Sequence, residues 1–353
     1  MKIIKKGVVS SLKGGLFTYQ AWPSVCADEN GDIYVVCSGL RMGHLCPFGK
    51  IVMYISRDGG ETFSLPQIVT DSFLDDRDPG ILYIGGGEML VTRAAHPACE
   101  YETEYLDWIK EESEEAGTGA VKYWSRLSES DRKGGCFYRK LYGCGNTAGE
   151  EKRIPVHCPH GPVLLNNGEI FYLGKELYTK DEHFSVYISK NRGESFEYVS
   201  RCPLPDGFTP AMVHEVHCAQ LPGGKIMALF RTHLTEDDNY FTITKTVSCD
   251  GGLTWSEWEK TGICGSPPHL CKTPGGSLAL TYGRRIPPYG IYTRSVSPEG
   301  EISGEEFMLD SCFDDDLGYP ATVSLPDGSL FTVFYAKLPG DEKNSIHYVR
   351  WEL

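Results

Sequence analysis

The sequence lacks several features by which common classes of protein are recognised. Its thirteen cysteines form no C-x-x-C pair, which argues against a zinc knuckle and a thioredoxin-like site. No apolar stretch reaches the length of a membrane span, and residues 1–16 are too polar for a signal peptide. We therefore expect a cytoplasmic protein with reduced cysteines, no membrane partner and no bound metal.

Positive charge is also in short supply. Lysine and arginine number 34 against 48 acidic residues, so the formal net charge is −14, and the basic residues form no long block. The phosphate backbone of a nucleic acid requires a basic face, so this composition argues against nucleic acid as a partner. A local group of arginines is still compatible with these numbers, because net charge constrains solubility more than the chemistry of a site.

Glycine and proline are abundant, with 40 and 21 residues, and they separate short apolar runs in the manner of many short strands joined by tight turns. One turn recurs with the form S-x-D-x-G-x-T-W. It reads SCDGGLTW at 248–255, SRDGGETF at 56–63 and SKNRGESF at 189–196, with weaker copies at 130–137 and 297–300. The starts at 130, 189 and 248 are spaced by 59 residues, which indicates a structural repeat.

The chemistry of each copy is that of a rigid hairpin turn. Its Asp or Asn side chain can accept backbone N–H groups of the same turn, and its glycines supply positive φ. A second series of turns precedes β-rich runs such as KIMALF at 225–230 and SLFTVFY at 329–335. About six such pairs, each of roughly four strands, predict an all-β, six-bladed β-propeller of four-stranded antiparallel blades. We expect one domain over residues 1–353, in which 347–351 closes the ring beside 1–9.

One stretch, 104–127, breaks the repeat. It is rich in helix-forming residues and carries Leu106, Trp108 and Ile109 near one face. We expect a short helical insertion, at about 101–130, between the first two blades. A lid, a contact in a homo-oligomer and a solvated decoration are all compatible with this stretch.

The repeated turns and strands resemble those of the sialidase superfamily along nearly the whole chain. The resemblance implies an enzyme whose substrate carries a carboxylate at the anomeric carbon. A carboxylate nucleophile would be repelled there, so these enzymes use a neutral tyrosine with a glutamate as its base. A separate aspartate is the general acid, and three arginines bind the substrate carboxylate through charge-assisted hydrogen bonds.

Several of these parts can be matched. The segment DLGYPA resembles the nucleophile segment of the family and nominates Tyr319 as the nucleophile. The segment HEVH resembles its glutamate segment and nominates Glu215 as the base, with Arg231 at the end of the next strand as one arginine. The segment YGRRIPPYG nominates Arg285 as another.

Two parts are missing. Where the first arginine is expected the chain reads QAWP, and the region of the acid, MGHLCPFGK, contains no aspartate. His44 is the candidate proton donor in that region, and Asp78, at the next innermost strand, is a second. Arg41 and Arg77 are candidate replacements for the absent arginine.

In a propeller the start of each innermost strand faces the central funnel. The six units therefore bring a set of residues to one site: Trp22, Arg77, His160, Glu215, Pro268 or His269, and Tyr319. Trp22 and His160 accordingly join the arginines as candidates for binding substrate. Structural roles stay open, with Tyr319 as a cap on the funnel, Glu215 as an ion-pair partner, and Arg77 with Asp78 as a salt bridge.

Three functions fit these residues. The first is a glycoside hydrolase, a sialidase-like exo-glycosidase that cleaves a terminal, anionic sugar from a small-molecule or oligosaccharide substrate. The second is a uronate-type oligosaccharide lyase, in which Tyr and His serve as base and acid while Arg neutralises the carboxylate. The third is a non-catalytic carbohydrate-binding propeller that has lost its acid. None of the three requires a cofactor.

Overall fold

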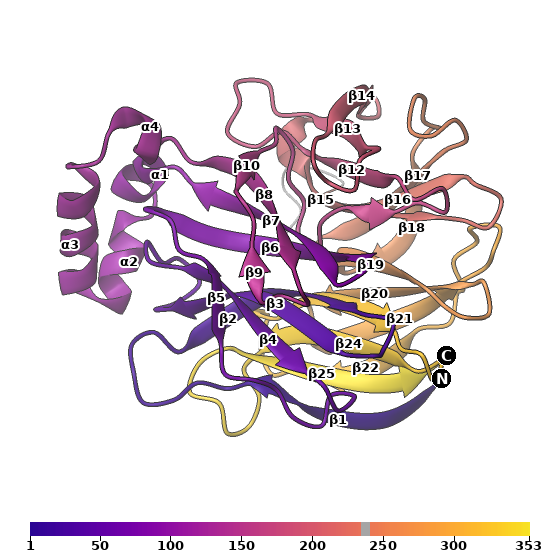
Figure 1. The fold of residues 1–353 in the computed structure, drawn as a ribbon, viewed down its shortest axis with the longest axis horizontal. Coiled ribbons are helices and arrows are strands. Elements are labelled where there is room, and N and C mark those ends of the chain that lie inside the picture. Colours follow the sequence, from indigo (N-terminus) through magenta and orange to yellow (C-terminus); the bar gives the residue numbers. More distant parts are fainter. Residues whose placement is uncertain (234–240) are drawn as a thin grey trace.

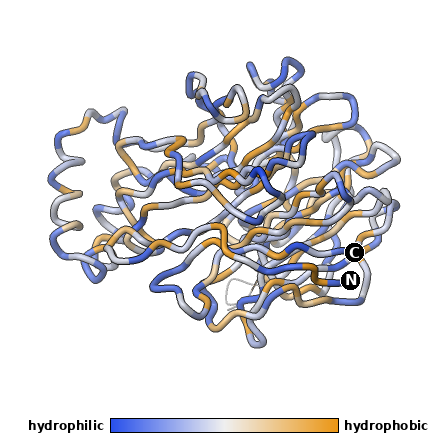
Figure 2. The backbone as a smooth tube through the Cα atoms, turned by 60° about the horizontal axis from the view of Figure 1, so that its bottom comes forward, coloured by the Kyte–Doolittle hydropathy of each residue, from blue (hydrophilic) through white to orange (hydrophobic). Residues whose placement is uncertain are grey.

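The structure is a computed structural model that describes residues 1–233 and 241–353. Within these residues it is a six-bladed β-propeller, as predicted, with each blade an antiparallel sheet (Figure 1). Hydrophobic residues concentrate along the strands in the middle of the molecule, and hydrophilic residues follow the peripheral loops (Figure 2). The middle strands are buried on both faces because neighbouring blades pack against them.

Four of the blades are built from strands that follow one another along the chain. The first contains β2 (Tyr19–Ala27), β3 (Ile33–Arg41), β4 (Lys50–Ser56) and β5 (Gln67–Thr70). The third contains β11 (Val163–Leu164), β12 (Ile170–Lys175), β13 (Phe184–Ser189) and β14 (Glu197–Cys202). The fourth, after a 3-10 helix at Pro210–Met212, contains β15 (Val213–Gln220), β16 (Ile226–Thr232), β17 (Thr242–Ser248) and β18 (Glu259–Cys264). The fifth contains β19 (Ser266–Lys272), β20 (Leu278–Arg284), β21 (Gly290–Val296) and β22 (Phe307–Ser311).

The sixth blade closes the ring with strands from both ends of the chain. It contains β23 (Gly318–Ser324), β24 (Leu330–Ala336), β25 (Ser345–Glu352) and, at its outer edge, β1 (Lys2–Ser10). β1 pairs antiparallel with β25 from Lys2 opposite Glu352 to Ser10 opposite Ile346. The predicted closure is confirmed, and the two termini lie side by side (Figure 1).

The helical insertion lies within the second blade, so its predicted place between the first two blades is wrong. This blade contains β6 (Asp75–Gly85), β7 (Glu88–His96), β8 (Gly135–Tyr142) and β10 (Lys152–Arg153), with β9 (Thr147–Ala148) paired to β8. Between β7 and β8 the chain forms α1 (Ala98–Thr103), α2 (Leu106–Glu112), α3 (Glu114–Trp124) and α4 (Glu129–Arg132). The helices leave and rejoin one sheet, since Ala95 pairs with Gly135. The weak turn copy at 130–137 is therefore the end of this insertion and the start of β8.

The insertion packs its apolar face against the loop that follows β3. Tyr101, Ile109 and Trp124 form one buried cluster with Met42 and Leu45 of that loop. Figure 1 shows the helices projecting from the side of the ring. None of the helices in the described part of the chain is long and apolar enough to cross a membrane.

The three strong copies of the recurrent turn make the same hydrogen bonds. Asp58 Oδ1 accepts the backbone N–H of Thr62 at 2.9 Å, and Asp250 Oδ1 accepts that of Thr254 at 2.9 Å. The asparagine of the third copy accepts an equivalent bond at 3.0 Å. Each turn joins the third and fourth strands of its blade, which places all three at the rim and away from the central funnel.

Candidate active site

Several blades have an unusual backbone conformation at or just before the start of the innermost strand. Among the described residues, Trp22, Asp78, His160 and Tyr319 have φ values of 52°, 54°, 74° and 47°. Positive φ is uncommon for residues other than glycine, and strained residues of this kind cluster at functional sites. The pairing registers of β2, β6 and β23 shift at this same point. Asp78, rather than the predicted Arg77, is therefore the residue of the second blade that corresponds to Tyr319.

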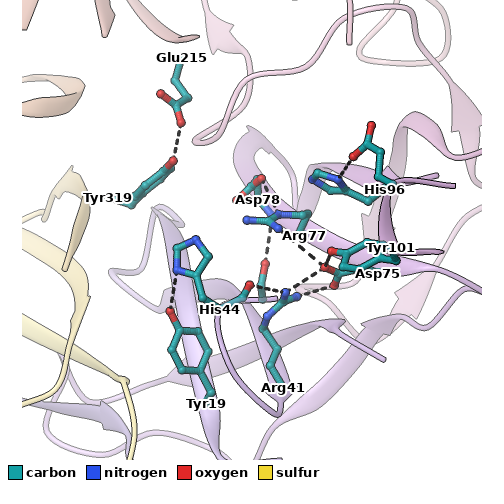
Figure 3. Close-up of polar contacts among 12 residues, drawn as sticks. Tyr19, Arg41, His44, Asp75, Arg77, Asp78, His96, Tyr101, Glu215 and Tyr319 are labelled. Carbon is teal, nitrogen blue, oxygen red and sulfur yellow. Dashed lines mark hydrogen bonds and ion pairs between the residues drawn. The ribbon is translucent and has the colours of Figure 1, made fainter. Parts of the chain in front are cut away.

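Tyr319, Glu215 and Arg231 meet at the centre of the funnel. Glu215 is on β15 and Arg231 is on the adjacent β16, so their side chains leave neighbouring strands. Arg231 Nη1 donates to both oxygens of Glu215, at 2.9 and 3.1 Å, and lies 3.2 Å from Tyr319 Oη. The hydroxyl of Tyr319 donates to Glu215 Oε1 (Figure 3). The structure thus brings three predicted residues together.

The electrostatics of this triangle fix the protonation states. Burial opposes ionisation of Glu215, but the charge of Arg231 outweighs it and lowers the pKa of Glu215 to about 2. Burial, with the Glu215 charge beside it, holds the pKa of Tyr319 well above its usual range. At neutral pH a protonated phenol therefore donates to an ionised carboxylate, which is the resting state of a nucleophile beside its base.

Arg285 lies over the ring of Tyr319. It follows β20, and its guanidinium carbon is 5.7 Å from the centre of the Tyr319 ring. Its Nη2 donates to Tyr335 Oη at 3.0 Å. Arg285 also lines a cavity of about 170 Å³ that opens beside Asp315. Two cations therefore lie close to Tyr319, with Arg231 at its hydroxyl and Arg285 over its ring.

His44 lies on the loop after β3. Its Nδ1 is 3.1 Å from Asp316 Oδ1 and 3.2 Å from Tyr19 Oη, and 46% of its side-chain surface is exposed. Its ring meets the Trp22 ring edge to face, with centres 4.9 Å apart. Partial desolvation by the surrounding protein lowers the pKa of His44, and Asp316 opposes that shift. His44 thus lies at the opening of the funnel, and its Nδ1 contacts Asp316 and Tyr19.

Asp78 and Arg77 line a cavity of about 360 Å³ that also contains Tyr319 and Glu215. Arg77 Nε donates to Asp78 Oδ2 at 3.1 Å, so the predicted salt bridge is present and both side chains also face the cavity. Figure 3 shows this pair across from Tyr319 and Glu215. The wall is completed by residues of β7, of the insertion and of the third and fourth blades, which the sequence did not single out: His96, Glu100, His157, Lys175, Tyr178, Glu182 and His214.

Arg41 does not face the funnel, so its predicted substrate contact is wrong. The side chain has no exposed surface, and Asp75 accepts from its Nη1 and Nη2 at 2.5 and 2.9 Å. Its Nη2 also donates to the His44 carbonyl at 3.0 Å. Arg41 therefore supports the loop that carries His44.

Trp22 is also a support rather than a surface for substrate, because only 2% of it is exposed. Its ring contacts two guanidinium groups, with the Arg77 and Arg41 carbons 4.2 and 4.8 Å from the ring centre. Its edge contacts reach His44 and Tyr319. Trp22 thus packs beneath His44, Arg77 and Tyr319 and supports their positions.

His160 lies deeper in the central channel than predicted. It packs against His269 and His217, with ring centres 5.0 and 6.0 Å away, and lines a separate cavity of about 330 Å³ at the other end of the channel. Burial lowers the pKa of His160 to about 4, so the ring is neutral. Backbone N–H groups of the next blade donate to His217 Nδ1 and His269 Nδ1, so these rings link the blades. Among the described residues, no group of three or more His, Cys, Asp or Glu side chains is placed to hold a metal.

No protein-family model and no curated protein matches the chain. Several solved structures are similar to it. The chain is similar to a protein of unknown function from Dyadobacter fermentans, with 20% identity and a TM-score of 0.78 over 99% of this chain and 98% of that one. It is also similar to the NanB sialidase of Streptococcus pneumoniae, with 14% identity and a TM-score of 0.71 over 98% of this chain and 70% of that one.

A third similar structure is the intramolecular trans-sialidase of Ruminococcus gnavus, with 13% identity and a TM-score of 0.64 over 96% of this chain and 95% of that one. The chain therefore has the sialidase-like β-propeller fold. At these identities the likeness establishes the fold, and the reaction must be argued from the site.

Proposed function

We propose that the protein is a sialidase-like exo-glycosidase that cleaves a terminal, anionic sugar from a small-molecule or oligosaccharide substrate. The observation that carries the proposal is the contact of Tyr319 with ionised Glu215 and with Arg231. A propeller that only binds sugar has no need of a phenol held against its own base in the funnel. The sialidases among the structures of similar fold support the same class of reaction.

In the first half of the reaction, Tyr319 Oη attacks the anomeric carbon and its proton passes to Glu215. The bond from that carbon to the leaving oxygen breaks, and protonated His44 supplies the proton that the leaving group needs. Arg231 and Arg285 hold the carboxylate of the substrate by charge-assisted hydrogen bonds. A phenol suits this carbon because it brings no negative charge toward that carboxylate.

In the second half, water attacks the anomeric carbon and gives a proton to His44. The bond to Tyr319 breaks, and Glu215 returns the proton to the phenol oxygen, so both side chains regain their starting states. Asp78 lines the same cavity and is the second candidate for proton transfer to the leaving group.

The test is turnover of aryl glycosides of ulosonic acids, uronic acids and neutral sugars by the wild-type protein and Tyr319→Phe. We expect phenol release from an anionic sugar and a loss of at least about 100-fold in the variant. The matched control is Tyr198→Phe on the exposed strand β14, which should keep full activity. An unsaturated product that absorbs in the ultraviolet would assign a lyase instead, and binding without turnover would assign a carbohydrate-binding propeller.

A further inference from the structure

The carboxylate of Asp316 is the centre of a hydrogen-bond network beside the funnel. Asn344 Nδ2 donates to its Oδ2 at 2.7 Å and Tyr19 Oη to the same oxygen at 2.9 Å. Its Oδ1 lies 3.1 Å from both His44 Nδ1 and Tyr335 Oη. Four donors from different segments therefore converge on one carboxylate, three residues before the nucleophile Tyr319.

This network determines which nitrogen of His44 carries a proton. An ionised carboxylate only accepts hydrogen bonds, so Nδ1 must be the protonated nitrogen of the neutral ring. Burial opposes the ionisation of Asp316, but its contacts with His44 and Tyr19 prevail and lower its pKa. Nε2 is then the atom of His44 that accepts or gives a proton at the funnel.

The same carboxylate is connected to the arginine that flanks Tyr319. Tyr335 donates to Asp316 at 3.1 Å and accepts from Arg285 Nη2 at 3.0 Å. A single oxygen of Asp316, Oδ1, therefore contacts both His44 and Tyr335, the partner of Arg285. A fixed distance between a proton donor and a carboxylate-binding arginine is what a positioned reaction requires.

We propose that Asp316 is the positioning residue of this site, which orients His44 so that Nε2 exchanges the proton of the leaving group, and which ties His44 to Arg285. The inference rests on the proposed glycosidase function. Asp316 acts through His44 and need not touch the substrate. The residue has the place of the orienting carboxylate in other His-based catalytic groups.

The charged and titratable groups around His44 set the sign of the expected pH effect. Asp316 favours the imidazolium, whereas burial, Arg77 and Arg41 disfavour it, and Tyr19 is a neutral neighbour. Removing the charge of Asp316 must therefore lower the pKa of His44. Because proton donation requires the imidazolium, the alkaline limb of the pH profile should move to lower pH, by about one unit.

The experiment compares Asp316→Asn with wild type on two glycosides of the sugar that is turned over. One releases dinitrophenolate, which departs without protonation. The other is a methyl glycoside, whose oxygen must be protonated so that methanol can leave. We expect kcat to fall at least about 100-fold on the methyl glycoside and only a few-fold on the dinitrophenyl glycoside. The matched control, Asp206→Asn, removes an exposed carboxylate from the loop after β14 and should act like wild type on both.

Nitrogen NMR of the His44 ring provides a readout that does not depend on turnover. Wild type should show a protonated Nδ1 in the neutral ring, and Asp316→Asn should show a lower pKa with a mixture of tautomers. Equal losses on the two glycosides, or an unchanged His44 pKa, would overturn the inference. If wild type cleaves nothing, the glycosidase proposal fails, and a neutral His44 without the Nδ1 proton would remove the positioning role as well.

Discussion

Replacing Glu215 by glutamine should destabilise the fold as well as abolish activity. The carboxylate is bonded to Arg231 Nη1 at 2.9 and 3.1 Å, and its pKa is about 2 against an ordinary value of 4.5. This difference corresponds to roughly 3 kcal/mol of stability at neutral pH. Removing the charge leaves the buried guanidinium of Arg231 without its partner, which costs a similar amount.

The assay is thermal and denaturant unfolding of Glu215→Gln at pH 7. For a chain of this size we expect the melting temperature to fall by about 4 °C. The matched control is Glu197→Gln, because the ion pair of Glu197 with Lys190, at 3.7 Å, is exposed and should contribute little. Adding Arg231→Gln to Glu215→Gln should recover most of the stability but none of the activity. A single variant as stable as wild type would refute the reasoning.

The pH dependence gives a second check on the same prediction. The pKa of Glu215 is lowered on folding, so its contribution is fully present above pH 4.5 and is lost as the pH falls toward 2. Wild type should therefore lose stability through this window, and Glu215→Gln should lose correspondingly less. Parallel curves for the two proteins would contradict the lowered pKa.

Two further substitutions test the supports of the site. Arg41→Met should cost about 3 kcal/mol in urea unfolding, because it removes the nearest cation from the buried Asp75 carboxylate and leaves it with Tyr101 and, at 3.8 Å, Arg77. Arg41→Met with Asp75→Leu should recover much of the loss, and an unchanged single variant would contradict the buried pair. Trp124→Ala should cost about 3–5 kcal/mol, because the side chain is 1% exposed inside the cluster that joins the insertion to the His44 loop. A loss below about 1 kcal/mol would mean that the insertion packs loosely on that loop.

The repetition of turns made the propeller predictable, and the insertion shows where repetition misleads. Ser56, Ser189 and Ser248 begin turns that the structure places at equivalent points of three blades. Ser130 has similar neighbours in sequence but belongs to helix α4. Spacing alone cannot distinguish a degenerate turn from the end of a helix. The insertion was therefore expected between two blades, although it lies between β7 and β8 of the second blade.

The site was predictable where a charge has its partner within one motif. Glu215 and Arg231 lie on paired strands, so their meeting followed from the hairpin. Arg41 stands at a similar strand end, but Asp75 reaches it from the next blade, and nothing local in the sequence marks that contact. Tyr335 could not be distinguished from the apolar run around it, because its role depends on the contacts of its hydroxyl with Asp316 and Arg285, which the sequence does not show.

The pairing of β1 with β25 has a mechanical consequence. Lys2 lies opposite Glu352, so the first and last paired residues are at the same end of the closing ribbon. A pulling force applied to the two termini would load the hydrogen bonds of this ribbon one after another, from the free ends inward, rather than all at once. The ring would thus open by unzipping, under a modest force. Force between one terminus and the body of the molecule would instead load many hydrogen bonds of the sheet at the same time.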